Sequence, residues 1–436
     1  MESLSMGATK VILLANFAIA SSLDGGMLGT SEDLHPFWGS KTPYLLSHKL
    51  LREAYRKGLD IPQRSTQCKF EATFQEAAAT EVLGFWGVFR HGSRCPTVKR
   101  MRAIRRIESM LETEAKREEQ TDSDDGEKKK KKGDTKTGFH RSAQNNESLS
   151  ETECQTEDNA GMLTFKGKQE MFDLGKRLRN RLPSLFSTND SGYYSPEHFQ
   201  IRATQKQRAL QSASAFTMGL FGGVQQQQQG NLSDNPKSQS VAIDMEDKKV
   251  LYFHKTCRRY MEYKARELTN PNSERYKFNA TRIAPIVAKV KGRIRLKDAA
   301  KESNFTMAEL WAAWSGCQFG DRFFCSLFTS EEALLMEYSE DLASYWQKGY
   351  GNPLNSQMSC LLMKDLILSL EEASMRNSRR EEAEVPLARL YFAHAETLYA
   401  LLPLLEMYKD PEPLRSQHNL EKIRRKIGDC SFEKHE

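Results

Sequence analysis

The chain has 436 residues, of which 39% are hydrophobic and 28% charged, and its formal net charge at neutral pH is +6. This length is enough for a large core, either in two domains or in one domain with a large insertion. Basic and acidic residues are too nearly balanced for a protein that coats polyanions such as nucleic acid, whereas a modest positive charge suits a small anionic substrate.

The first 20 residues have the pattern of a secretory signal peptide. Residues 11–20 (VILLANFAIA) are apolar but too few to cross a bilayer. They end in Ala18, Ile19 and Ala20, an A-x-A cleavage pattern. The alternative is a buried N-terminal helix. Because no later apolar run is long enough to span a membrane, we expect no transmembrane helix and a location in the endoplasmic reticulum lumen or outside the cell. Peripheral association with a membrane is left open.

Cysteines and glycosylation sequons agree with the secretory route. In an oxidising lumen some cysteines would pair as disulfides, although spacing alone does not give the connectivity. None lies in a C-x-x-C motif, so a zinc site is not indicated. The cysteines are Cys68, Cys95, Cys154, Cys257, Cys317, Cys325, Cys360 and Cys430. The N-x-S/T sequons, which predict a glycoprotein, are at Asn146, Asn189, Asn231, Asn279 and Asn304.

Two polar segments interrupt the chain. Residues 113–159 contain an acidic run at 122–125 and a lysine run at 128–132. Like-charge blocks without apolar residues cannot bury a core, so we expect a disordered insertion there. The alternative for the lysine run is polyanion binding or nuclear import. Residues 224–240, with a glutamine run at 225–229, predict a second flexible loop.

The remaining segments divide into a mixed core and a helical part. Residues 65–81 are ambiguous between helix and strand, whereas helical patterns dominate between 248 and 380. Thr329 followed by Glu332 is a capping-box pattern for one of these helices. We therefore expect an α/β core formed by residues 65–112, 160–220 and 385–436, and a mostly helical subdomain over 221–384.

A strand, a turn and a helix surround the sequence RHGSRCP, which begins at Arg90. Residues 82–89 (VLGFWGVF) predict a buried strand, and residues 96–112 (PTVKRMRAIRRIESMLE) predict an amphipathic helix. A helix N-terminus offers unpaired N–H groups to an anion. Arginine matches phosphate oxygens, and a histidine such as His91 can act as nucleophile or as acid and base. The turn is therefore predicted to bind phosphate.

The same layout recurs near the C-terminus. Residues 387–392 predict a second buried strand, followed by a turn at 393–397 (AHAET) and a helix at 398–408. Between the two turns the pattern predicts an amphipathic helix at 165–185, a strand at 198–203 and a helix at 204–219 that begins near Arg208. Because the carboxyl ends of parallel strands meet at one edge of a sheet, we expect the two turns to face each other.

These motifs resemble a known family. The turn RHGSRCP is similar to the RHGxRxP signature of the histidine acid phosphatase branch of the histidine phosphatase superfamily, a pattern that chance gives on the order of once in ten thousand such chains. The stretch LYFAHAETLYALLPLLEMYKD resembles the H-A-E region of the multiple inositol polyphosphate phosphatases. The resemblance extends over residues 36–420 and implies an α/β fold, with a phosphoglycerate-mutase-like three-layer core and a helical insertion subdomain.

The resemblance also implies roles for individual residues in a two-step hydrolysis. His91 would attack phosphorus and form a phosphohistidine, which water then cleaves. Glu396 would be the general acid for the leaving alcohol and later the base for water. Arg90, Arg94, Arg208 and His394 would bind the phosphate oxygens. No metal or other cofactor is needed for this scheme.

Some assignments have plain alternatives. Taken singly, Arg90 and Arg94 could be surface charges and His91 a buried, hydrogen-bonded histidine. Lys99, one turn into the predicted helix, could contact further phosphates of the substrate, or it could be a solvated lysine. The combined motif is what favours the catalytic interpretation for His91.

The expected activity is hydrolysis of phosphomonoesters on a small-molecule polyphosphate, namely inositol polyphosphates such as phytate. The resemblance adds 2,3-bisphosphoglycerate as a second candidate substrate class, and no nucleic-acid partner is expected. One alternative is a general acid phosphatase, and another is a truncated, non-catalytic relative that binds polyanions. The sequence also differs from the family, with Cys95 in place of a larger residue and Ala393 in place of glycine. The resemblance implies a further strand beyond residue 436, and if that segment is missing, we expect one face or edge of the core sheet to be uncovered.

Overall fold

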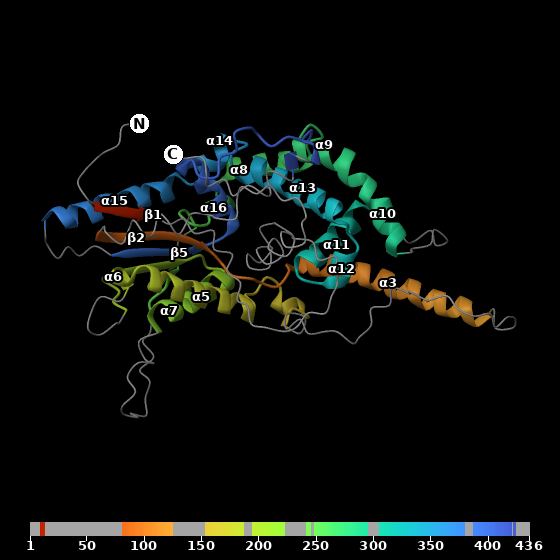
Figure 1. Ribbon diagram of the computed structural model, residues 1–436, viewed down its shortest axis with the longest axis horizontal. Helices are drawn as coiled ribbons and strands as arrows, with labels where there is room; N and C mark the ends of the chain where they lie inside the picture. Colours follow the sequence, from red (N-terminus) through yellow and green to blue (C-terminus); the bar gives the residue numbers. More distant parts are fainter. Residues whose placement is uncertain are drawn as a thin grey trace, which may run out of the picture.

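A five-stranded parallel sheet forms the centre of the α/β part (Figure 1). The computed structural model describes residues 9–13, 81–124, 153–186, 194–222, 241–245, 248–294, 305–379, 387–420 and 422–423. The strand order is β1-β2-β5-β3-β4, and all neighbours are parallel. The strands are β1 (Thr9–Leu13), β2 (Glu81–Arg90), β5 (Ala388–Ala393), β3 (Phe199–Ala203) and β4 (Asp244–Met245). The predicted buried strands at 82–89, 198–203 and 387–392 are thus present.

Strand β1 comes from the range expected to be a signal peptide. Thr9–Leu13 pairs with β2 at one edge of the sheet. The other residues of the range 1–20 lie outside the described residues, so the signal peptide stays a prediction.

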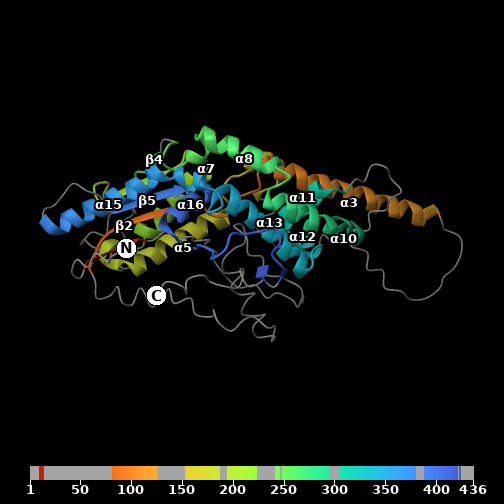
Figure 2. The ribbon, with the colours of Figure 1, turned by 90° about the horizontal axis from the view of Figure 1, so that it is seen from above.

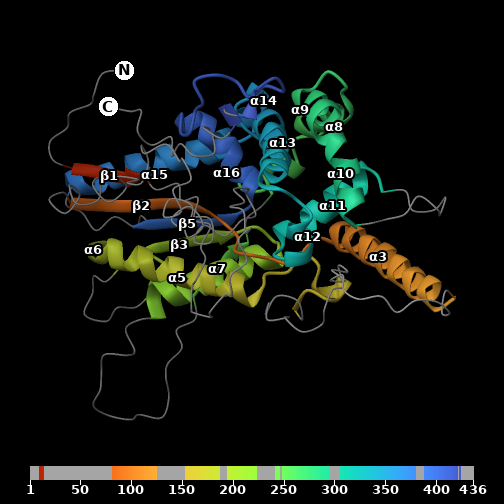
Figure 3. The same ribbon diagram turned by 45° about the vertical axis from the view of Figure 1, so that its right-hand side comes forward.

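Helices α5 (Phe165–Arg181), α6 (Pro183–Phe186) and α7 (Gln207–Phe221) cover one face of the sheet (Figures 1 and 3). The helical spacing of Met171, Leu174 and Leu178 turns these side chains towards the sheet, as the sequence predicts, and all three are buried. Phe89 on β2 lies between Phe216 on α7 and Phe392 on β5, with ring centroids 4.7 Å and 5.2 Å away. This apolar contact fixes α7 against the strand ends.

Helices α15 (Cys360–Arg379) and α16 (Ala395–Leu401) cover the opposite face, which completes three layers. Trp86 and Tyr391 point towards α15, where Asp365 Oδ2 accepts hydrogen bonds from Trp86 Nε1 at 2.9 Å and Tyr391 Oη at 2.8 Å. The sequence range of α15 lies inside the expected helical subdomain of residues 221–384. In the structure it instead belongs to the sheet layers, because its apolar stripe packs on β2 and β5.

The other helices form a separate cluster beside the sheet (Figure 2). Helix α13 begins at the predicted position, and Thr329 and Glu332 form a capping box. The buried core of the cluster includes Trp314, Phe324 and Tyr338. Its helical elements are α9 (Glu274–Phe278), the π-helix η5 (Asn279–Ile283), α10 (Ala284–Ile294), α11 (Met307–Gln318), α12 (Arg322–Ser326) and α13 (Ser330–Lys348). Helix α3 (Val98–Asp124) packs on it through Ile107, whereas α8 (Arg258–Thr269) and α14 (Pro353–Gln357) contribute no residue to this core.

The charged insertion differs from the expectation of disorder at both of its ends. Helix α3 (Val98–Asp124) continues well past Glu112, because the sequence ETEAKREEQ consists mostly of good helix formers. At the other end, a disulfide joins Cys154 to Cys95 and a short 3₁₀ helix η2 (Glu157–Asn159) follows. Arg102 of α3 bonds Glu157 there. The rest of 113–159, and all of the loop at 224–240, lie outside the described residues.

Four other features bear on the secretory interpretation. A second disulfide joins Cys317 and Cys325, whereas Cys257 and Cys360 are unbonded. Of the sequons only Asn279 is described, and its Oδ1 accepts a 2.6 Å hydrogen bond from Ser339 Oγ. Among the described residues, no helix is both long and apolar enough to cross a membrane.

Candidate active site

The two predicted turns meet at the carboxyl edge of the sheet. Arg90, the last residue of β2, is in register with Ala393, the last residue of β5. The next residue of each strand is a histidine, and the rings of His91 and His394 lie with centroids 5.5 Å apart. The main-chain N–H of His91 donates to the Ala393 carbonyl at 3.1 Å. The parallel register therefore brings together imidazoles from the two halves of the chain.

His91 has the tautomer and charge of a nucleophile. Its Nδ1 lies 2.9 Å from the carbonyl oxygen of Gly92. A carbonyl only accepts hydrogen bonds, so Nδ1 must carry the proton and Nε2 must hold the free electron pair. Burial, followed by the positive charges of Arg90 and Arg208, lowers the pKa of His91 well below its usual value. The ring is therefore neutral, which leaves Nε2 able to attack phosphorus.

Three buried arginines form a cluster at this imidazole, with Arg90 and Arg208 acting on the ring and Arg94 coupled to both of them. Burial, and then the charges of Arg208 and Arg90, lower the pKa of Arg94 to about 10. Burial likewise lowers the pKa of Arg90 and of Arg208, and Arg208 Nε has no hydrogen-bond partner within the described ranges. Clustered buried cations are unfavourable unless opposite charge compensates them. The arrangement is therefore suited to an anion with several oxygen atoms.

His394 is held between two side chains of the neighbouring strand and helix. Arg208 Nη2 lies 3.4 Å from its Nδ1, and because arginine only donates, that nitrogen must accept. Nε2 then carries the proton and donates to Thr204 Oγ1 at 3.0 Å. Burial, and then the charge of Arg208, lower the pKa of His394 to about 3. To donate to a phosphate oxygen, as expected from the sequence, the Nε2–H of His394 would have to give up its hydrogen bond to Thr204 Oγ1.

Glu396 lies in the first turn of α16, just after His394. Burial alone would raise the pKa of Glu396, but the positive charges of Lys348 and Lys264 and a main-chain hydrogen bond outweigh it, so the pKa falls below its usual range. The carboxylate is thus ionised in the unliganded protein. A bound polyanion would oppose these cations and favour the protonated form. Lys348 belongs to α13, so the helical cluster contributes to the electrostatics of the site.

Lys99 differs from the other predicted residues in its exposure to solvent. Lys99 is exposed, whereas its neighbour Arg100 is half-buried, lowers the pKa of Arg94 through its charge and stacks 5.9 Å from the ring centroid of Phe319. The other six predicted residues, Arg90, His91, Arg94, Arg208, His394 and Glu396, are together.

Sequence reasoning missed several neighbours of the site. The rings of Tyr252 and His254 lie 5.1 Å and 6.0 Å from His394. They reach it because the short 3₁₀ helix η4 (Phe253–Lys255) is anchored by Thr397 Oγ1, which donates to the Leu251 carbonyl at 2.7 Å. No motif marks these residues. Only the fold places η4 over the end of β5.

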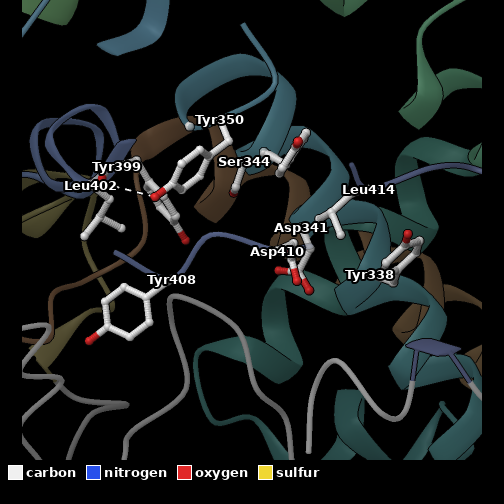
Figure 4. A pocket seen from close by; sticks show the side chains of 11 residues that line it. Tyr338, Asp341, Ser344, Tyr350, Tyr399, Leu402, Tyr408, Asp410 and Leu414 are labelled. Carbon is white, nitrogen blue, oxygen red and sulfur yellow. Dashed lines mark hydrogen bonds between the residues drawn. The ribbon is translucent and has the colours of Figure 1, made fainter. Parts of the chain in front are cut away.

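A cavity of about 220 Å³ lies beside the site, between α13, α16 and the segment around Asp410 (Figure 4). Tyr399 and Tyr350 line one side, and Asp341 and Asp410 lie on another. None of the predicted catalytic residues lines this cavity. Tyr399 links the cavity to the site, because its phenol interacts electrostatically with Arg90.

In the described ranges, no group of three or more His, Cys, Asp or Glu side chains is placed to hold a metal ion.

A neutral imidazole among arginines at the carboxyl edge of a parallel sheet is the arrangement expected of a phosphatase that uses histidine. Residues 83–427 match the Histidine phosphatase superfamily (branch 2), and the chain belongs to this family.

Known relatives have related names. Multiple inositol polyphosphate phosphatase 1 of Homo sapiens is 26% identical over 404 residues, which cover 91% of this chain and 75% of the relative. The protein of the same name from Gallus gallus is 26% identical, and the match covers 62% of this chain and 57% of that protein. Phytase A of Emericella nidulans is 23% identical over 61% of this chain and 57% of its own length. The chain thus spans three quarters of the human relative and under two thirds of the other two.

A solved structure supports the fold. Bifidobacterium longum multiple inositol polyphosphate phosphatase, in complex with inositol hexasulfate, matches with a TM-score of 0.52 and 16% identity, over 77% of this chain and 76% of that one. The α/β fold with helical insertion expected from the sequence is therefore confirmed.

Proposed function

We propose that the protein is a phosphomonoesterase that hydrolyses inositol polyphosphates through a phosphohistidine on His91. The observation that carries the proposal is the state of His91: neutral, with Nδ1 protonated against Gly92 and Nε2 free, beside Arg90 and Arg208. The names of the relatives, multiple inositol polyphosphate phosphatase and phytase, support the substrate class.

The reaction proceeds in two displacements. In the first, Nε2 of His91 forms a bond to phosphorus, the bond from phosphorus to the ester oxygen breaks, and Glu396 gives its proton to the departing alkoxide. In the second, Glu396 takes a proton from water, the hydroxide attacks phosphorus, and the N–P bond breaks to release inorganic phosphate. Arg90, Arg94 and Arg208 hold the three non-bridging oxygens throughout.

Glu396 must be protonated when the alcohol departs. Its pKa is low in the unliganded protein because Lys348 and other cations face it. Phosphate groups of the substrate neutralise these cations and return the carboxyl group towards its protonated form. A substrate with several phosphates therefore activates its own general acid, which favours polyphosphates over simple monoesters.

The remaining expectations are part of the same proposal. His394 contributes a hydrogen bond to the phosphate, and 2,3-bisphosphoglycerate is a second candidate substrate. The secretory route, with signal peptide cleavage and glycosylation, is supported by the two disulfides, since disulfides persist in oxidising compartments.

The test compares kcat/KM for inositol hexakisphosphate and for p-nitrophenyl phosphate. An inositol polyphosphatase gives the higher value with the hexakisphosphate. A preference for the aryl ester would identify a general acid phosphatase instead. Binding of inositol hexakisphosphate with no release of phosphate from either compound would identify a non-catalytic polyanion-binding protein.

A further inference from the structure

Glu170 is a buried carboxylate bound to the catalytic turn. It lies on α5, is only 2% exposed and belongs to none of the motifs that marked the site. Its Oε2 accepts a hydrogen bond from the main-chain N–H of Ser93 at 2.8 Å, and its Oε1 accepts one from Ser93 Oγ, also at 2.8 Å. Both carboxylate oxygens are thus directed at one residue, two positions after His91.

The peptide unit that Glu170 holds is the one that orients His91. The N–H of Ser93 and the carbonyl of Gly92 belong to the same planar peptide, and no cis peptide is present in the described chain. In a trans peptide these two groups point in opposite directions. Glu170 therefore holds one side of the plane, while Nδ1 of His91 bonds the carbonyl on the other side at 2.9 Å.

Because Gly92 is flexible, the Gly92–Ser93 peptide can rotate easily unless hydrogen bonds restrain it. Gly92 has no Cβ, and one added there would lie 2.3 Å from the Gly167 carbonyl oxygen, so glycine is required by this close approach. The same absence of a side chain allows alternative backbone angles. Ser212 Oγ accepts from the Gly92 N–H at 3.1 Å, but that group belongs to the preceding peptide. Glu170 Oε2 accepts the hydrogen bond from the N–H of the following peptide.

The carboxylate also contributes charge. Arg90 and Glu170 interact electrostatically, so Glu170, although burial raises its pKa, partly compensates the arginine cluster when it is ionised. A charged acceptor on the N–H polarises the peptide and strengthens the bond that its carbonyl accepts. The hydrogen bond from His91 Nδ1 to the Gly92 carbonyl oxygen becomes stronger, which favours the tautomer of His91 with Nε2 free.

We propose that Glu170 is a positioning residue for His91, which through the Gly92–Ser93 peptide fixes the tautomer and direction of the imidazole without touching the substrate. The inference rests on the proposed role of His91 as nucleophile. It extends that role to a residue on a helix that the catalytic motifs do not include.

The experiment replaces Glu170 in the full chain and measures two quantities. Glu170→Ala and the volume-conserving Glu170→Leu remove the acceptor, and we expect the rate of His91 phosphorylation to fall roughly a hundredfold, with KM changed less than about threefold. Glu170→Gln keeps an oxygen for the Ser93 N–H and restores the rate to within about tenfold of wild type. The matched control is Glu309→Ala, because Glu309 is also buried and accepts from the N–H and hydroxyl of one residue, Thr306, at the start of α11. We expect Glu309→Ala to lower the melting temperature of the protein but to leave the rate of His91 phosphorylation unchanged.

The second quantity is the His91 tautomer, read from ¹⁵N chemical shifts of labelled histidine and assigned with His91→Ala. Wild type shows a protonated Nδ1, whereas Glu170→Leu shows a mixture of tautomers. A phosphorylation rate and tautomer in Glu170→Leu equal to those of wild type would overturn the inference. The tautomer does not depend on turnover, so a wild-type protein without phosphatase activity would contradict the proposed function and still leave this comparison decisive.

Discussion

The imidazole rings of His91 and His394 lie with their centroids 5.5 Å apart, one after β2 and the other after β5. Both are neutral because burial and the neighbouring arginines lower their pKa values. Their hydrogen bonds are complementary, since His91 keeps Nε2 free while the Nε2 of His394 carries a proton. In the proposed mechanism the first ring attacks phosphorus, and the second donates to the phosphate after giving up its hydrogen bond to Thr204.

Glu396→Gln should reveal the general acid. A glutamine cannot protonate a departing alkoxide, so we expect alkyl phosphates, which have poor leaving groups, to slow about a hundredfold, and p-nitrophenyl phosphate to slow much less. Steady-state and single-turnover rates on both substrates provide the measurement. Glu406→Gln, at an exposed site, is the control. Equal slowing of both substrates would contradict the acid role.

Arg100 and Lys99 form a matched pair for testing the outer part of the site. Arg100 is half-buried beside Arg94, whereas Lys99 is exposed. Arg100→Ala should raise KM for inositol hexakisphosphate about tenfold, since a charge-assisted hydrogen bond contributes about 1.5–3 kcal/mol, and should leave KM for an aryl monophosphate nearly unchanged. Lys99→Ala should change neither KM more than about twofold. Equal effects of the two substitutions would show that the helix contributes only general positive charge.

The two disulfides should differ in their contribution to stability. The Cys95–Cys154 bond closes a sequence separation of 59 and the Cys317–Cys325 bond one of 8. Loss of chain entropy in the unfolded state predicts a stabilisation of about 4 kcal/mol for the first and about 2.5 kcal/mol for the second. Urea unfolding of Cys95→Ser with Cys154→Ser, and of Cys317→Ser with Cys325→Ser, measures both. A larger loss for the short loop would contradict the entropic account.

His254 should make the protein less stable in acid. Burial lowers its pKa to about 4, below the value of about 6.5 for an unfolded chain. The unfolded state therefore binds more protons between these pH values, and the free energy of unfolding falls as the pH is lowered from 7 to 4, by about 3 kcal/mol from this group. His254→Phe should reduce that fall in phosphate-free urea titrations. An unchanged pH dependence would show that His254 does not resist protonation in the folded protein.

Much of the site could be predicted because it depends on local patterns and one topological rule. Strands β2 and β5 correspond to short apolar runs in the sequence, and His91 and His394 follow directly after them. Since parallel strands end at the same edge of a sheet, the proximity of His91 and His394 follows from pattern alone. Arg208 could be expected near the strand ends because it lies in the first turn of the helix that follows β3.

The parts that could not be predicted depend on tertiary packing. Glu170 is next to Met171 on the apolar face of α5, but sequence alone does not show that a carboxylate there would bond to Ser93. Helix α15 has the periodicity of any amphipathic helix, so its packing on the sheet instead of in the helical cluster was not visible. The half-burial of Arg100 against Phe319 also depends on packing, because the phase of a helix is uncertain in its first turn.

The central claim is that His91 forms a covalent bond to phosphorus. Rapid-quench trapping with inositol hexakisphosphate, followed by mass spectrometry of the peptide that contains residues 90–94, tests it directly. The account predicts a phosphohistidine at His91 in wild type, and in His91→Ala no trapped species and activity reduced by at least about a thousandfold. Turnover by His91→Ala comparable to wild type, or phosphate trapped on a different residue, would contradict it.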